Sequence, residues 1–342
     1  MNFQNDRYTL RLALPEDDAG IRAVFESASF SGGLSIQYLR PSPLRSFAAD
    51  GDDVKMLVVR DNETGRIAAV GGAVIRREYL GGSTARTAYL TGLKVHPDYQ
   101  KQLYFIARAY QYMGTLLADC ACVYSTVLDD NTAVIKMFEK HHRNMPEYRY
   151  LGHYMTYCFH GGRKFFTLDR DDRSGFDALM QTHFSQLALT PANPDYDGFG
   201  EKHFYALREN GLIRACCFAG DQRALKQYRM TAYGGIYKLL SHLPTQWLGY
   251  PKLPKAGSII PHQVISYLYI ADNDPALCRK FLRTVAAESG AGVLIWGGFE
   301  THPLCPAMDT LKAVRYGSRL YEVIWSGEPQ ITGAVGMETA LL

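Results

Sequence analysis

Apolar and polar positions follow two recurring patterns along the first half of the chain. Residues 8–14 alternate as in a half-buried strand, and the Pro-Glu-Asp-Asp stretch at 15–18 is typical of a helix start. Further strands are expected over 55–60, 67–79, 87–95, 121–128 and 150–159, and helices after Pro97 and over 131–140. Residues 30–52 are rich in Ser, Gly and Pro and are expected to be irregular. The pattern predicts a sheet flanked by helices.

The same order of elements returns beyond a linker candidate at 160–164 (His-Gly-Gly-Arg-Lys). Strands are expected over 203–208, 212–219, 264–270, 292–296 and 313–325, and helices over 176–184, 275–289 and 306–311. Little residue identity links the halves, so a structural repeat rests on element order alone. We predict a mixed α/β (α+β) fold with domains over 1–160 and 165–326, and a small, polar tail over 327–342 that is disordered.

Composition narrows the class of protein. A length of 342 residues suits about two domains. With 37 Lys+Arg against 34 Asp+Glu the net charge is +3, and no basic run stands out, so we expect no nucleic-acid partner. No apolar stretch reaches 18 residues and the first residues lack a signal-peptide pattern, so we expect no membrane span. Seven scattered cysteines predict free thiols in the cytoplasm.

Three segments of the first half resemble the GNAT N-acetyltransferase superfamily. Residues 10–25 resemble its opening strand and helix, and residues 89–107 resemble its cofactor strand and loop. Residues 123–140 resemble the next strand and an N-x-x-A-x-x-x-Y-E-K helix. The pieces occur in the right order and spacing over about residues 8–160. The resemblance implies two tandem GNAT-like domains, each a twisted mixed sheet flanked by helices.

The resemblance also implies acetyl-CoA as co-substrate, and no metal. In GNAT proteins an R/Q-x-x-G-x-G/A loop binds the pyrophosphate of coenzyme A with the free backbone N–H groups of a helix N-terminus. Here Gln100 matches, but Leu103 and Phe105 stand where glycines usually lie. The resemblance assigns the following residues to the cofactor: Leu93, Lys94, Val95, Gln100, Lys101, Gln102, Leu103, Tyr104, Phe105, Asn131 and Phe138.

The catalytic groups that the resemblance implies are incomplete. Backbone N–H groups near Leu93 and Val95 would polarise the thioester carbonyl. Residues 91–94 offer no carboxylate base, and Phe138 lies at the usual general-acid Tyr position, where it cannot donate a proton. Six tyrosines could substitute, and the sequence does not choose among Tyr104, Tyr124, Tyr148, Tyr150, Tyr154 and Tyr157.

The second half is expected to be a degenerate GNAT-like domain without cofactor. Its equivalent of the cofactor strand is 266–270, and the segment after it has no glycine and carries Asp272 and Asp274, which would repel a pyrophosphate. Metal or dinucleotide motifs are not found: Cys120-x-Cys122 has no partner pair at zinc spacing, and core packing explains it better.

Two functions follow from these observations. The first is an acyl-CoA-dependent N-acyltransferase that moves an acetyl group by direct transfer to a primary amine of a small molecule or peptide, held between the halves. The second is a catalytically inactive GNAT-like binding or regulatory module, which Leu103, Phe105 and Phe138 motivate. The acceptor, the acyl chain and the oligomeric state stay open.

Overall fold

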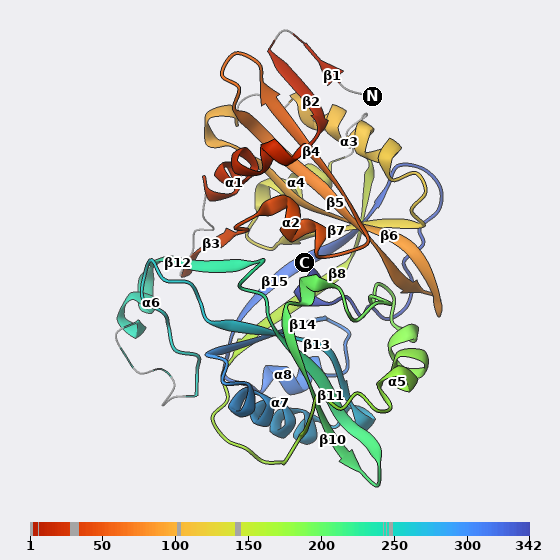
Figure 1. The fold of residues 1–342 in the computed structure, drawn as a ribbon, viewed down its shortest axis with the longest axis vertical. Helices are drawn as coiled ribbons and strands as arrows, with labels where there is room; N and C mark the ends of the chain where they lie inside the picture. Colours follow the sequence, from red (N-terminus) through yellow and green to blue (C-terminus); the bar gives the residue numbers. More distant parts are fainter. Residues whose placement is uncertain are drawn as a thin grey trace.

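One continuous mixed sheet runs through the whole molecule (Figure 1). The computed structural model describes residues 3–5, 7–27, 34–100, 104–140, 145–241, 243, 245 and 249–342. In these residues thirteen strands form the large sheet in the order β1-β2-β4-β5-β6-β7-β15-β8-β14-β13-β11-β10-β9, and β3 and β12 form a second, two-stranded sheet. The mixed α/β fold that the sequence predicts is confirmed.

The first half supplies eight strands and four α-helices among the described residues. Their bounds are β1 (Phe3–Gln4), β2 (Tyr8–Leu12), α1 (Asp18–Glu26), β3 (Leu34–Leu39), α2 (Pro43–Ala48), β4 (Asp53–Asp61), β5 (Ile67–Leu80), β6 (Ser83–Val95), α3 (Tyr104–Leu116), β7 (Cys122–Leu128), α4 (Thr132–Phe138) and β8 (Glu147–Phe159). Helix α3 packs on one face of the sheet and α1 and α2 on the other, each through its own apolar cluster.

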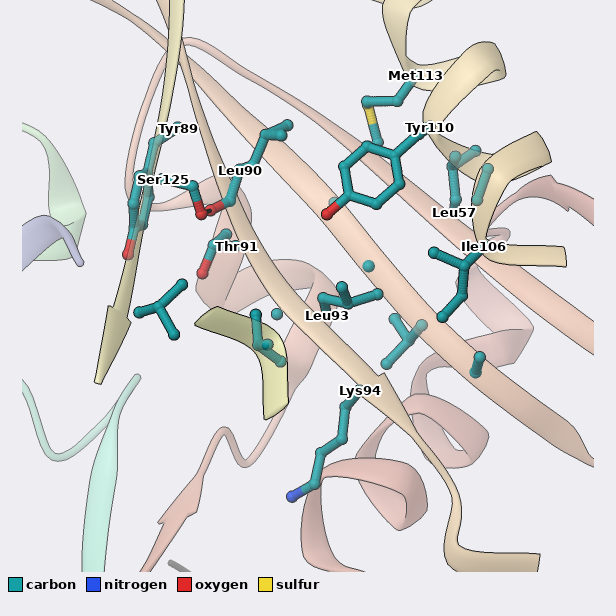
Figure 2. Close-up of a pocket in the computed structure, with 18 of the residues that line it drawn as sticks. Leu57, Tyr89, Leu90, Thr91, Leu93, Lys94, Ile106, Tyr110, Met113 and Ser125 are labelled. Atoms are coloured by element: carbon teal, nitrogen blue, oxygen red, sulfur yellow. Dashed lines mark hydrogen bonds between the residues drawn. The ribbon is translucent and has the colours of Figure 1, made fainter. Parts of the chain in front are cut away.

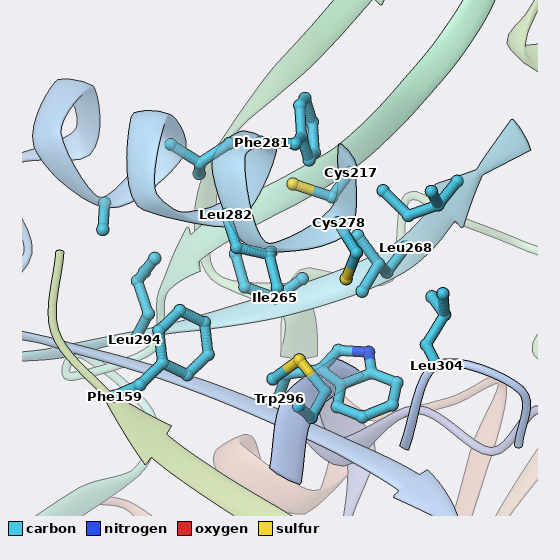
Figure 3. Packing of buried hydrophobic residues seen from close by; sticks show 14 of the residues in the cluster. Phe159, Cys217, Ile265, Leu268, Cys278, Phe281, Leu282, Leu294, Trp296 and Leu304 are labelled. Atoms are coloured by element: carbon cyan, nitrogen blue, oxygen red, sulfur yellow. The ribbon is translucent and has the colours of Figure 1, made fainter. Parts of the chain in front are cut away.

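The second half continues the sheet from the other side. Its elements are β9 (Asp169–Arg170), α5 (Phe176–Thr182), β10 (Glu201–Glu209), β11 (Leu212–Asp221), β12 (Gln227–Tyr233), α6 (Gly235–Leu240), β13 (His262–Ile270), α7 (Pro275–Ser289), β14 (Val293–Phe299), α8 (Cys305–Asp309) and β15 (Ala313–Ile324). Its core lies between α7 and the sheet, where Cys278, Phe281 and Leu282 pack over Ile265 and Leu294 (Figure 3).

The two halves exchange a strand at the centre of the sheet. Strand β15 pairs antiparallel with β7 and with β8, and β8 pairs antiparallel with β14 and with β15. Read from its own edge, the first half places four antiparallel strands (β1, β2, β4, β5) and the second half three (β9, β10, β11). Each half then has a parallel pair, β6–β7 or β13–β14, and next to it the last strand of the other half. The strand order is therefore nearly symmetrical about the β8–β15 pair.

Two sequence expectations are wrong. The stretch 30–52 was expected to be irregular, but its described part contains β3 and α2, and β3 pairs with β12, about 190 residues further along the chain. The tail 327–342 was expected to be disordered, but Ile331, Val335 and Met337 are buried and a 3-10 helix, η7 (Thr339–Leu341), packs against β13 and β14. In both stretches the apolar residues are scattered among polar ones, so no helix or strand periodicity could be recognised from the sequence.

Candidate functional site

A pocket of about 420 Å³ opens in the first half, where β6 and β7 separate (Figure 2). The two strands pair in parallel from Thr87 opposite Cys122 to Leu90 opposite Ser125. At this last pair, Ser125 Oγ donates a hydrogen bond of 3.1 Å to the carbonyl oxygen of Leu90. Beyond this point both strands line the pocket, so a ligand can reach the edge of β6 that faces β7.

A β-bulge lies in β6 at this edge. Thr91 pairs with Gly72 and Lys94 with Val70, so that Gly92 and Leu93 together stand opposite Gly71 on β5. Gly92 has φ +68°, a conformation that glycine adopts without strain. A Cβ there would lie 3.1 Å from Phe47 Cζ and 3.2 Å from Phe25 Cζ. The bulge thus interrupts the regular pairing of β6 with β5 beside the pocket, and the two Phe rings leave room only for glycine at its centre.

One side of the pocket is an apolar lobe between the sheet and α3. Leu93 is 43% exposed into the pocket although it is a large apolar residue, which is unusual for the interior of a strand. Aliphatic side chains of β2, β4, β5 and α3 continue the lobe inward: Leu10, Leu57, Val59, Ala69, Ile106, Ala109 and Met113. Such a lining favours burial of an apolar part of a ligand.

A pair of tyrosine hydroxyls lies at the α3 wall. Tyr148 of β8 donates a hydrogen bond of 2.7 Å to the hydroxyl oxygen of Tyr110, whose own proton is then available to a ligand. Tyr110 lines the pocket and its hydroxyl points into it (Figure 2). Burial raises the pKa of Tyr110 to about 12, and the hydrogen bond from Tyr148 opposes part of that rise. Tyr110 is therefore a neutral proton donor at physiological pH.

Phe138, at the position where the superfamily usually has a tyrosine, supports this pair. Its ring stacks on the ring of Tyr148, with centroids 3.6 Å apart and planes inclined by 12°. Phe138 thereby fixes the orientation of Tyr148. The hydroxyl group that faces the pocket belongs to Tyr110, the hydrogen-bond partner of Tyr148. The sequence analysis missed Tyr110 because it falls in the apolar stripe of a helix, where a core residue is expected.

The other candidate tyrosines are engaged elsewhere. Tyr124 donates to Glu78 (2.7 Å), Tyr154 to the carbonyl oxygen of Met337 (2.9 Å) and Tyr157 to Asp309 (3.0 Å). Tyr150 is exposed, and of Tyr104 the structure describes only the backbone. Of the five candidate tyrosines whose side chains the structure describes, Tyr148 alone joins the polar groups at the pocket.

Polar groups on the opposite side are few. Lys94 Nζ donates a hydrogen bond of 2.6 Å to the carbonyl oxygen of Phe25, and burial lowers the pKa of this amine. Asn131 caps α4, where its Oδ1 accepts from the amide of Val134 at 3.4 Å. The Tyr38 hydroxyl has no hydrogen-bond partner among the described residues. No Asp or Glu is among the described residues that line the pocket.

The structure brings together five of the eleven residues that the resemblance assigned to the cofactor: Leu93, Lys94, Phe105, Asn131 and Phe138 line the pocket. Phe105 is buried against Tyr8, with ring centroids 6.1 Å apart, so its side chain belongs to the core under the loop. Val95 packs on the α3 side, and Gln100 is exposed at the end of a short 3-10 helix. Lys101, Gln102 and Leu103 lie outside the described residues, and Tyr104 begins α3.

Within the described ranges no group of three or more His, Cys, Asp or Glu side chains could hold a metal ion. No helix in the described part of the chain is long and apolar enough to cross a membrane.

Comparison with solved structures gives matches along almost the whole chain. N-myristoyltransferase of Saccharomyces cerevisiae with bound myristoyl-CoA aligns with 96% of this chain and 85% of its own, at 9% identity and a TM-score of 0.58. A GCN5-related N-acetyltransferase of Anabaena variabilis aligns with 92% of this chain and 72% of its own, at 11% identity and a TM-score of 0.50. No family model and no curated protein matches the sequence. The chain therefore has the GNAT fold that the sequence resemblance predicted.

Proposed function

We propose that the protein is an acyl-CoA-dependent N-acyltransferase whose active site is the pocket of the first half. The observation that carries the proposal is the glycine-centred bulge on β6 at the point where β6 and β7 separate. The bulge lines a cavity that is apolar on one side and carries a tyrosine hydroxyl, and we infer that its backbone amides face this cavity. Fold neighbours that are N-acyltransferases support the proposal.

The reaction would be a direct transfer. The thioester carbonyl oxygen accepts hydrogen bonds from amides at Gly92 and Leu93, which stabilise the charge that develops on this oxygen. The amine nitrogen attacks the carbonyl carbon, the C–N bond forms, and the C–S bond breaks. Tyr110 transfers its hydroxyl proton to the leaving thiolate and regains a proton from solvent. Water removes the amine proton, because the described lining holds no carboxylate.

The acyl group is acetyl in the simplest form of the proposal. In a second form of the proposal the acyl group is longer. The apolar lobe between the sheet and α3 favours this form, because an acetyl group would leave most of the apolar surface without contacts. The myristoyl-CoA bound by the yeast N-myristoyltransferase is consistent with a long chain on this fold. A series of acyl-CoA donors separates the two forms.

The acceptor would enter from the side of Phe25, Phe47 and Tyr38. Tyr38 stands on β3, which pairs with β12, so the second half lies next to this side of the pocket although the described lining residues all belong to the first half. An amine of a small molecule or a peptide fits a pocket mouth that lies beside the junction of the two halves. All seven cysteines are free thiols, which suits the cytoplasmic location included in the proposal.

The first experiment is a calorimetric titration of the protein with acetyl-, octanoyl- and myristoyl-CoA, with free coenzyme A as control. We expect micromolar binding, about −8 kcal/mol, of at least one donor to one site per chain. Thiol release with an amine library then tests transfer. Binding without transfer to any amine would favour the inactive binding module. No binding of any donor at millimolar concentration would overturn the acyltransferase and leave the inactive binding or regulatory module.

A further inference from the structure

The second half repeats the bulge of the first. On β13, Ser266 pairs with Phe218 and Tyr269 with Cys216, so that Tyr267 and Leu268 together stand opposite Cys217. The pattern equals that of β6, with Tyr267 in the place of Gly92 and Leu268 in the place of Leu93. Tyr267 even keeps the left-handed backbone, with φ +49°, which costs a non-glycine residue about 1–3 kcal/mol.

The strands beside this bulge also separate in the same way. β13 and β14 pair in parallel over three residue pairs, from His262 opposite Val293 to Val264 opposite Ile295, and no further. In the first half the corresponding separation holds the pocket. In the second half Leu268 is 5% exposed where Leu93 is 43% exposed. Leu268 packs under α7 with Cys278 and Leu304 (Figure 3).

The segment 337–341 occupies the side of the bulge on which Tyr267 lies. Helix η7 (Thr339–Leu341) contacts both β13 and β14, and Ala340 and Leu341 join the apolar cluster that contains Tyr267. A Cβ on Gly297 of β14 would overlap the side chain of Thr339, so β14 is shaped for close approach of this segment. The hydroxyl of Tyr154 anchors the start of the segment through the carbonyl oxygen of Met337, at 2.9 Å.

Glu338 makes the contact that corresponds to a bound carbonyl group. Its Oε1 accepts a hydrogen bond of 2.8 Å from the amide of Tyr267, which is the bulge amide of this half. Burial raises the pKa of Glu338 to about 8, so the carboxyl group is largely protonated at neutral pH and places no full charge in the core. A carbonyl-type oxygen thus occupies the bulge amide of the second half.

Buried donors hold the rest of the segment by its backbone, as a bound peptide is held. The carbonyl oxygen of Ala340 accepts from Gln222 Nε2 and from Lys226 Nζ, both at 2.6 Å. The carbonyl oxygen of Leu341 accepts from Arg76 Nη2 at 3.0 Å, and Arg76 belongs to β5 of the first half. The segment is therefore recognised by both halves.

We propose that residues 337–341 are an intramolecular peptide ligand that occupies a second cleft, equivalent to the pocket of the first half, with the Glu338 carboxyl group at its bulge amide. The second half is thus a peptide-binding unit whose ligand is supplied by the chain itself. This inference rests on the geometry of the second half and does not require that the first half bind acyl-CoA.

A complementation experiment tests the proposal. A chain that stops at residue 334 is titrated with a synthetic peptide of residues 335–342, Val-Gly-Met-Glu-Thr-Ala-Leu-Leu, and thermal unfolding and calorimetry are recorded. We expect saturable binding of one peptide and a raised midpoint of unfolding. A Glu→Gln peptide keeps a carbonyl acceptor and should bind similarly, whereas a Glu→Ala peptide should bind at least about tenfold more weakly. A scrambled peptide is the control.

A folded shortened chain that binds none of these peptides, or binds the scrambled one equally well, overturns the proposal. Where the shortened chain does not fold, hydrogen exchange on the full chain replaces the titration. The amide of Tyr267 should lose protection in Glu338→Ala and keep it in Glu338→Gln, and equal protection in both variants overturns the proposal. None of these measurements uses acyl-CoA, so failure of the proposed function would not affect them.

Discussion

At the scale of single residues, Tyr110 carries the sharpest prediction about the proposed reaction. Tyr110→Phe removes the hydroxyl that faces the pocket while the ring and its packing stay. We expect kcat for acyl transfer to fall about 10²- to 10⁴-fold with KM little changed, because a general acid acts in the transition state. With its pKa at about 12, Tyr110 stays protonated, so kcat should not fall between pH 7 and pH 10 through loss of this proton.

Two neighbouring tyrosines serve as controls for this variant. Tyr148→Phe removes the hydrogen bond to Tyr110 but leaves the Tyr110 proton in place, so its loss of kcat should be smaller. Tyr112→Phe, on the same helix but outside the pocket lining, should leave kcat unchanged. If Tyr110→Phe retained full activity in steady-state assays, the leaving thiolate would have to be protonated by another group.

Gly92 carries a prediction about the floor of the pocket. Gly92→Ala places a Cβ 3.1 Å from Phe47 and forces alanine to adopt φ +68°. We expect it to lower the free energy of unfolding in urea by about 1–3 kcal/mol and to weaken acyl-CoA binding. Gly81→Ala is the matched control, since it has φ +56° and open space around its Cβ. Equal effects on acyl-CoA binding would refute a special role of Gly92.

At the scale of elements, Asp274 shows how the structure changes the interpretation of a motif. The sequence analysis treated this residue as an acid that repels a pyrophosphate. In the structure it caps α7, where its Oδ1 accepts from the amides of Ala276 (2.7 Å) and Leu277 (3.3 Å). Asp274→Ala should therefore lower the free energy of unfolding by about 1 kcal/mol, and Asp274→Asn should lose much less. Equal losses in urea denaturation would contradict the capping role.

Most elements could be predicted from the sequence because their patterns are local. The strand at 87–95 and the helices at 131–140 and 275–289 show the expected spacing, and the structure has β6, α4 and α7 there. Strand β3 could not be predicted in this way, because its residues are only partly buried and its partner β12 lies in the other half. Strand exchange likewise depends on contacts between distant residues.

The candidate site was only partly predictable for the same reason. Leu93 and Lys94 belong to a strand that the sequence shows clearly, and they line the pocket. Tyr110 acquires its role only through Tyr148, 38 residues away, and Tyr148 only through its stack on Phe138. Phe138, at the position of the tyrosine in the motif, thus orients Tyr148 instead of supplying a hydroxyl group. No local sequence pattern could show that the hydroxyl group at the pocket belongs to Tyr110.

At the scale of the whole molecule, the strand exchange makes the two halves interdependent. β8 belongs to the first half by sequence, but both of its partner strands, β14 and β15, come from the second. A fragment of residues 1–162 would leave β8 without a partner strand and β7 with an unpaired edge, and such edges promote aggregation. We expect neither this fragment nor residues 163–342 to fold alone.

Coexpression of the two fragments should restore a soluble complex, because β8 and β15 can then pair across the break. The full chain should unfold in urea in a single transition that fluorescence and circular dichroism report at the same midpoint, since neither half keeps its sheet without the other. The 160–164 segment supplies the break because it lies between β8 and β9 and belongs to neither a helix nor a strand. A fragment 1–162 that is monomeric and shows its own cooperative unfolding would mean that β8 can close the first half unaided, and the two halves would then be independent domains joined by a shared edge.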